Sequence, residues 1–173
     1  MNPRPLTLRQ VAEHSASLEE FGRHFRDWLH ELRRHSSRPQ LVAAIAEEPP
    51  RLKDRFAGGA VADAWTAAYA DHISGKISRP APAWTANGRV APEPWFAVEG
   101  NHPALRLAAL RDSPGPFKAR NLFTAAVDLP FGLTAGRPVK PVEEKRRVNA
   151  ARQRRFQARR RAELQKLRKQ ARA

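Results

Sequence analysis

The sequence contains no cysteine, which excludes disulfide bonds, thiolate metal ligands and cysteine nucleophiles together. It also has no apolar run near the roughly 18 residues that a membrane-spanning helix requires. The first six residues, Met1–Leu6, show no apolar stretch of the kind that a signal peptide needs. We therefore expect a cytoplasmic protein that contacts no membrane.

Recognisable catalytic motifs are lacking as well. The sequence has no GxSxG motif, no phosphate-binding loop and no GxGxxG motif. Its six histidines are not spaced as metal ligands beside a carboxylate, and adjacent acidic pairs such as Glu19 and Glu20 do not face each other on a helix. We expect no metal, no cofactor and no enzymatic activity. An enzyme of unrecognised type, assembled from distant residues, is the alternative.

Acidic residues are scarce in one part of the chain. Residues 137–173 hold 15 Lys or Arg against three Glu, so this segment carries +12 of the total net charge of +15. Residues 1–136 carry the remaining +3 and are nearly balanced. Any argument for binding a polyanion therefore concerns the C-terminal segment first.

The first half of the sequence shows helical periodicity. Two capping pairs, Thr7 with Gln10 and Ser17 with Glu20, each precede apolar residues at helical spacing. Pro39 indicates the start of another helix, and a further apolar stripe follows the pair Gly58-Gly59. We expect a short helix around Leu8 and Val11, followed by helices at about 17–34, 39–46 and 61–74.

Residues 80–103 contain five prolines, which interrupt regular elements. The same segment holds Trp84, Trp95 and Phe96, whose large apolar side chains can fix an extended loop across helices. We expect this segment to be irregular, and a helix over 103–111 to follow it.

A last short helix is expected to begin at Ser113-Pro114, with Ser113 as its cap, and to include Phe123. Its polar residues Lys118, Arg120 and Asn121 are candidates for binding phosphate or a partner's carboxylates. The favoured alternative is structural. In that case Arg120 and Asn121 hold the proline-rich loop through hydrogen bonds to its backbone carbonyls.

The sequence thus predicts an all-α protein, with a small irregular helical domain, a Pro/Trp-rich loop segment and a C-terminal basic helical tail. We place the helical body at 1–131, a Pro/Gly hinge at 132–141 and the basic tail at 142–173. The tail contains no Gly or Pro and consists mostly of helix-forming residues.

The basic tail is the main candidate binding site. Its basic residues fall on every side of a helix, so they repel one another until phosphates or acidic groups neutralise them. Arg outnumbers Lys, which favours bidentate contacts with phosphate or carboxylate. A solvated extension that only raises solubility is the alternative. The candidate residues are Arg146, Arg147, Arg152, Arg154, Arg155, Arg159, Arg160, Arg161, Lys166, Arg168 and Lys169.

Three short motifs carry a resemblance to known proteins: PAWT at 82–85, PWF at 94–96 and SPxxFKxRNxF at 113–123. They resemble a group of small uncharacterised bacterial proteins that are associated, as antitoxins, with nucleotidyltransferase-like toxins. The resemblance extends over roughly 17–127. The long basic tail after Gly136 is a departure from that group.

The resemblance implies a non-enzymatic, antitoxin-like binding protein that neutralises a partner toxin and uses its tail on nucleic acid or on the toxin's acidic site. The alternative is an RNA- or DNA-binding accessory protein in which the basic tail is the main functional element.

Overall fold

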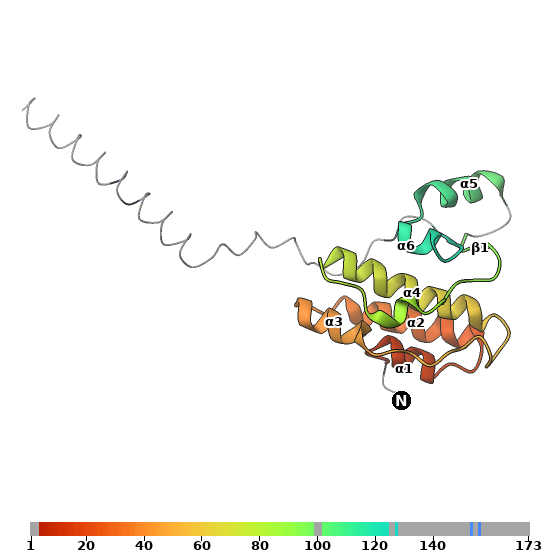
Figure 1. Ribbon diagram of the computed structural model, residues 1–173, viewed down its shortest axis with the longest axis horizontal. Helices are drawn as coiled ribbons and strands as arrows, with labels where there is room; N and C mark the ends of the chain where they lie inside the picture. The colour runs from red at the N-terminus through yellow and green to blue at the C-terminus, as the bar shows by residue number, and fades with distance from the viewer. Residues whose placement is uncertain (1–3, 99–101, 125–126, 128–152, 154–155, 157–173) are drawn as a thin grey trace, which may run out of the picture. The chain divides into compact units, whose positions relative to one another are not determined.

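The structure is a computed structural model that describes residues 4–98, 102–124, 127, 153 and 156 (Figure 1). The chain divides into two units, Met1–Thr134 and Ala135–Ala173. The described part of the first unit is mainly helical, which confirms the predicted fold class. In the second unit the structure describes Gln153 and Phe156, which are helical and exposed. The candidate basic residues of the tail lie outside the described residues.

Four helices form where the sequence predicts them. Thr7 caps the first of them by accepting a hydrogen bond from the Gln10 amide, and Ser17 caps the second through the Glu20 amide. The Glu20 carboxylate also accepts a hydrogen bond at 2.9 Å from the backbone amide of Ala16, the residue before the cap. The helices are α1 (Leu8–Glu13), α2 (Leu18–Leu32), α3 (Arg38–Ala46) and α4 (Gly59–Lys76).

Helix α4 lies at the centre of the domain, with 13 of its 18 residues buried. Its many alanines let α2, α3 and the segments after residue 80 pack closely around it. Tyr69 is the middle of an aromatic cluster, with ring centroids 4.9 Å from Phe25 and 5.1 Å from Phe117. Burial raises the pKa of Tyr69 to about 12. Trp28 is fully buried in the same core, and Trp65 is half-buried at its edge.

The start of α4 depends on two glycines. Gly58 has a φ of 82°, in the left-handed region that favours glycine. A Cβ on Gly59 would lie 1.9 Å from the Leu52 carbonyl oxygen, so only glycine lets the loop before α4 approach this closely. The Asp63 carboxylate then accepts hydrogen bonds from the Leu52 and Lys53 amides, which fixes that loop on the helix.

The second half contains short elements that the sequence predicts only in part. The helix over 103–111 is confirmed as α5, whereas two short strands were not predicted. Strand β1 pairs in parallel with β2, with Trp95 opposite Leu122 and Phe96 opposite Phe123. The elements are the 3₁₀ helix η1 (Ala83–Ala86), β1 (Trp95–Phe96), α5 (Pro103–Asp112), α6 (Gly115–Lys118) and β2 (Leu122–Phe123).

The prediction that the last helix includes Phe123 is wrong. Asn121 has a φ of 58°, which ends the helical path, and the chain beyond it runs beside residues 95–97. The Trp95 amide donates to the Asn121 carbonyl at 2.8 Å. The expected cap is also wrong, because Pro114 occupies the N-cap position of α6. The Ser113 hydroxyl instead bonds to the Ala109 carbonyl and the Thr124 backbone.

No helix in the described part of the chain has both the length and the apolar character that crossing a membrane would require.

Candidate partner-binding groove

Arg120 and Asn121, which the sequence predicts as part of a polar cluster near the end of the body, form hydrogen bonds within the domain. The Arg120 guanidinium is almost buried and donates to the Asp71 carboxylate at 2.5 Å and to the Thr85 carbonyl at 3.0 Å. The Asn121 amide donates to the Ala91 carbonyl at 2.9 Å. These bonds join the proline-rich segment to α4 and β2, so the structural alternative stated for these two residues is confirmed.

Lys118 bonds to a different part of the chain from Arg120. Its exposed ammonium group donates to the Arg111 carbonyl at the end of α5. The structure therefore does not present Lys118, Arg120 and Asn121 as one exposed cluster of hydrogen-bonding groups. A binding role for them stays a prediction that no contact described here supports.

Sequence reasoning missed Arg89, whose side chain is fully buried. Its guanidinium donates to the Asp63 carboxylate at 2.8 Å, to Glu48 at 3.1 Å and to the Pro49 carbonyl. The group also lies over the Trp84 ring, 5.2 Å from its centroid. A single arginine in a proline-rich segment carries no sequence signal for burial, because its partners lie far away along the chain.

Helix α3 carries apolar residues on two of its sides, and only one of these sides packs into the core. Leu41, Ala44 and Ile45 belong to the core. A second set of apolar residues at the i, i+3, i+4, i+7 spacing is exposed on the side away from the core. These residues are Pro39, Val42, Ala43 and Ala46. A helix that is apolar all round is normally buried, so this exposed face requires an explanation.

The segment after α4 forms the opposite wall of a groove along this face. Helix α4 ends in a Schellman motif, in which the Arg79 amide donates to the Ser74 carbonyl and the Ser78 amide to Gly75. Ser78 takes the left-handed position of that motif, with a φ of 55°. The Trp84 indole then donates to the Ile45 carbonyl at 3.1 Å and ties η1 to the end of α3.

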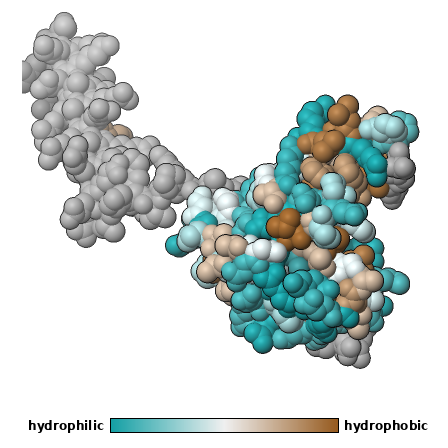
Figure 2. Space-filling model, turned by 45° about the vertical axis from the view of Figure 1, so that its right-hand side comes forward, coloured by the Kyte–Doolittle hydropathy of each residue, from teal (hydrophilic) through white to brown (hydrophobic). Residues whose placement is uncertain are grey.

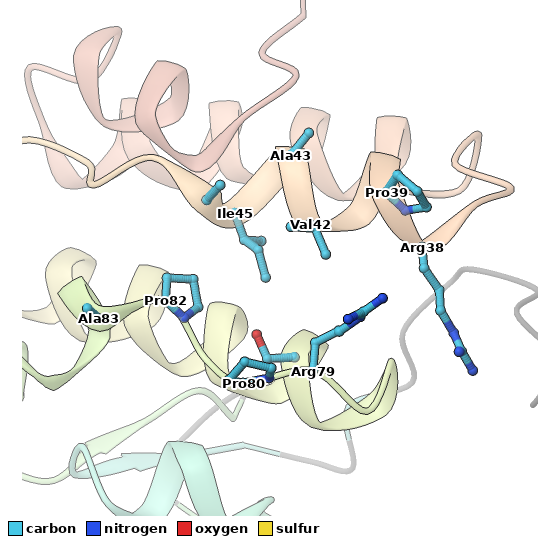
Figure 3. Close-up of a pocket in the computed structure, with 11 residues that line it drawn as sticks. Arg38, Pro39, Val42, Ala43, Ile45, Arg79, Pro80, Pro82 and Ala83 are labelled. Carbon is cyan, nitrogen blue, oxygen red and sulfur yellow. The ribbon is translucent and has the colours of Figure 1, made fainter.

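The groove has a volume of about 660 Å³. Val42 and Ile45 point from α3 across the groove toward Pro80 and Pro82 (Figure 3). This combination of an apolar cavity and a few polar groups is typical of a ligand or partner site.

Three polar groups line the otherwise apolar groove. Arg38 and Arg79 lie toward the same end, away from Ala83 (Figure 3). Neither guanidinium pairs with a carboxylate of the described residues. The Ser74 hydroxyl is buried and has no hydrogen-bond partner in the part of the chain that the structure describes.

A second apolar surface lies on the α5 side of the body. Leu105, Leu107 and Leu110 are all exposed, and Ala109 is the one buried residue of α5. Figure 2 shows hydrophobic surface gathered in this upper part of the body. A smaller depression of about 290 Å³ lies between α2 and α4 and includes the exposed Trp95. No charged residue lines this depression, so its chemistry specifies a partner less closely than the groove beside α3 does.

Within the described residues, no three His, Asp or Glu side chains converge in a way that could hold a metal ion.

Comparison of the chain with protein-family models, with curated proteins and with solved structures gave no match.

Proposed function

We propose that this chain is a non-enzymatic binding protein whose helical body docks a partner protein in the groove beside α3. Its basic C-terminal segment adds a second contact with a polyanion or an acidic surface. The observation that carries the proposal is the exposed apolar face of α3, which lines a groove that also holds two arginines without carboxylate partners among the described residues.

The apolar face of α3 has no role in the described fold. Its core-facing residues already pack against α4 and α1, while Val42 keeps 38% of its surface exposed. Contiguous exposed apolar surface of this kind marks interaction sites in soluble proteins. A partner that covers the groove would remove this surface from water, which is the main driving force for most protein association.

The antitoxin-like role is the specific form of this proposal, with a nucleotidyltransferase-like toxin as partner. Its support is the resemblance of the motifs at 82–85, 94–96 and 113–123. Trp84, Arg120 and Asn121 within those motifs bond to the fold itself. The shared motifs therefore support a shared body, in which Pro82 and Ala83 of the first motif also line the groove where we place partner selection.

The test is to isolate the partner from the source cells with the full chain and then titrate the purified partner by calorimetry. Val42→Trp fills the groove from an exposed position on α3 whose side chain points across it (Figure 3). Ala57→Trp places the same side chain at an exposed site outside the groove and is the control. We expect one-to-one binding by the original chain and the control, and at least about tenfold weaker binding by Val42→Trp.

Equal binding by both variants, or no partner at all, would contradict docking in the groove.

A second candidate function is supported by the charge of +12 on residues 137–173. In this case the chain is an accessory protein that binds RNA or DNA through its tail. If six to eight basic residues contact duplex phosphates, log affinity falls against log salt with a slope of about −5 to −7. Replacing Arg159, Arg160 and Arg161 with Ala would reduce the magnitude of that slope by about 2 to 3.

Titration of random duplex and random single strands, with the full chain and with a chain ending at Gly136, separates the two functions. Binding that is lost with the tail and falls steeply with salt favours the accessory protein. Binding of the purified partner that survives moderate salt and the loss of the tail favours docking in the groove.

A further inference from the structure

We propose that the groove beside α3 binds a peptide segment of the partner that carries acidic residues at one end and bulky apolar residues beside them. This inference rests on the proposed function and adds the chemistry of the segment that is recognised.

The charge of the groove specifies one end of the segment. Arg38 and Arg79 lie at the same end of the cavity (Figure 3), and none of the ion pairs among the described residues involves either of them. Elsewhere in the same domain, Arg89 and Arg120 each have a carboxylate partner within 3 Å. Guanidinium groups bind carboxylates in a bidentate geometry, so two of them favour an acidic occupant.

The rest of the groove specifies the apolar part. Away from the arginines, the lining residues are Val42, Ile45, Ala46, Pro82 and Ala83, none of which is charged. The small side chain of Ala46 leaves room for a bulky one on the partner. The apolar residues of the segment would therefore lie next to its acidic residues along the chain.

The Ser74 hydroxyl favours a peptide over a lipid-like anion. A fatty acid would satisfy the two arginines and the apolar wall, but its alkyl chain would leave this buried hydroxyl without a hydrogen bond. A peptide backbone offers amide and carbonyl groups at every residue, and satisfying a buried polar group contributes to affinity.

The basic tail of the same chain does not fit this site. Residues 137–173 carry a charge of +12, and their arginines would lie against Arg38 and Arg79. Like charges brought together in this way are unfavourable. An acidic segment of another protein is the occupant that the charges favour.

The experiment is a random peptide library displayed on phage, selected on the full chain and depleted on the Val42→Trp variant. We expect the enriched peptides to share one or two Asp or Glu residues next to Leu, Ile or Phe. The best peptide is then labelled, and its binding is measured by fluorescence anisotropy.

Three variants test the contacts of that peptide. Arg38→Ala and Arg79→Ala should each weaken binding by about tenfold, because each removes a hydrogen bond to a charged group. Arg33→Ala removes an exposed arginine outside the groove and should leave the affinity unchanged. Ser74→Ala should weaken peptide binding several-fold while raising the melting temperature, since it removes a buried hydroxyl that has no partner within the described ranges.

Each other outcome overturns the inference. Enriched peptides without acidic residues, or full peptide binding by Arg79→Ala, would show that the groove does not select peptides with Asp or Glu. No enrichment, together with binding of decanoate that depends on Arg79, would assign the groove to a lipid-like anion. Neither result decides the proposed function, which depends on whether Val42→Trp still binds the purified partner.

Discussion

Two arginines ten residues apart, Arg79 just before the proline-rich segment and Arg89 within it, have opposite surroundings. Arg89 is fully buried, bonds to Asp63, Glu48 and a backbone carbonyl, and lies over an indole ring. Arg79 is exposed beside an apolar groove and has no carboxylate partner among the described residues. The first arginine holds the fold together, whereas the second is available to another molecule.

The difference shows why a count of basic residues does not locate a binding site. Burying a guanidinium is unfavourable unless carboxylates and hydrogen bonds compensate it, so Arg89 and Arg120 have become part of the architecture. Exposed arginines are common on protein surfaces. Arg79 differs from an ordinary surface arginine because it borders a cavity with an apolar lining and a buried hydroxyl, that of Ser74, for which the described part of the chain offers no hydrogen-bond partner.

The largest expected effect comes from removing the buried arginine. Arg89→Met keeps most of the volume but leaves Asp63 as a buried charge without its ion-pair partner, which should lower the free energy of unfolding by about 3–5 kcal/mol. Arg79→Met is the matched control and should change it by less than about 0.5 kcal/mol. Urea denaturation measures both. Similar values for the two variants would remove the distinction between the arginines.

Arg120 should show a smaller effect of the same kind. Arg120→Met removes the bonds to Asp71 and to the Thr85 carbonyl, so we expect a loss of about 1.5–3 kcal/mol in the free energy of unfolding. The exposed neighbour Lys118 provides the control, because Lys118→Met should cost less than about 0.5 kcal/mol. Chemical denaturation of both variants checks this. A near-neutral Arg120→Met would return that residue to the list of candidate binding residues.

Trp84 contacts both the buried Arg89 and the end of α3, which lines the groove. Trp84→Phe keeps an aromatic ring under Arg89 but loses the indole bond to the Ile45 carbonyl, which should destabilise the domain by about 1–2 kcal/mol. Because that bond ties η1 to α3, the variant should also weaken binding of the selected peptide. Thermal melts and anisotropy measure the two effects. Unchanged peptide binding would mean that the groove keeps its shape without this bond.

The smallest expected effect concerns His72, which is buried. Unlike Arg89, it has no carboxylate partner among the described residues. Burial is the main cause that lowers the pKa of His72 below its usual value of 6.5. The unfolded chain therefore takes up a proton before the folded one does. Stability should fall as the pH drops from about 6.5 toward the lowered pKa of the folded state. Melting temperatures between about pH 7 and pH 5 should fall less for His72→Gln than for the original chain.

Identical pH profiles for His72→Gln and the original chain would show that other groups determine the acid sensitivity of the domain.

Much of the fold follows from local sequence signals. Thr7 and Ser17 cap their helices as the capping pairs predict, and Pro39 lies in the first turn of α3. The pairing of β1 with β2 had no such signal, since each strand has two residues and 25 residues separate Phe96 from Leu122. Strands this short show no alternation, so the sequence pattern cannot distinguish them from loop.

The groove was not predictable because the exposed face of α3 looks like a core face. Val42 and Ile45 are both apolar and lie three residues apart, yet one keeps 38% of its surface exposed and the other 2%. Which of them faces the core depends on where α4 lies. The two arginines of the groove come from positions 38 and 79, which no local spacing connects.

The sequence by itself determined the helical class, the caps and the uneven charge, because these depend on neighbouring residues and on composition. The tertiary structure decided which arginines are buried and which apolar face of α3 is left uncovered. It also buried the Ser74 hydroxyl, which has no hydrogen-bond partner among the described residues. Those properties arise from contacts between segments that are far apart along the chain. Burial and electrostatic compensation are set by such contacts, and they separate the arginines that hold the fold from those that are free to bind.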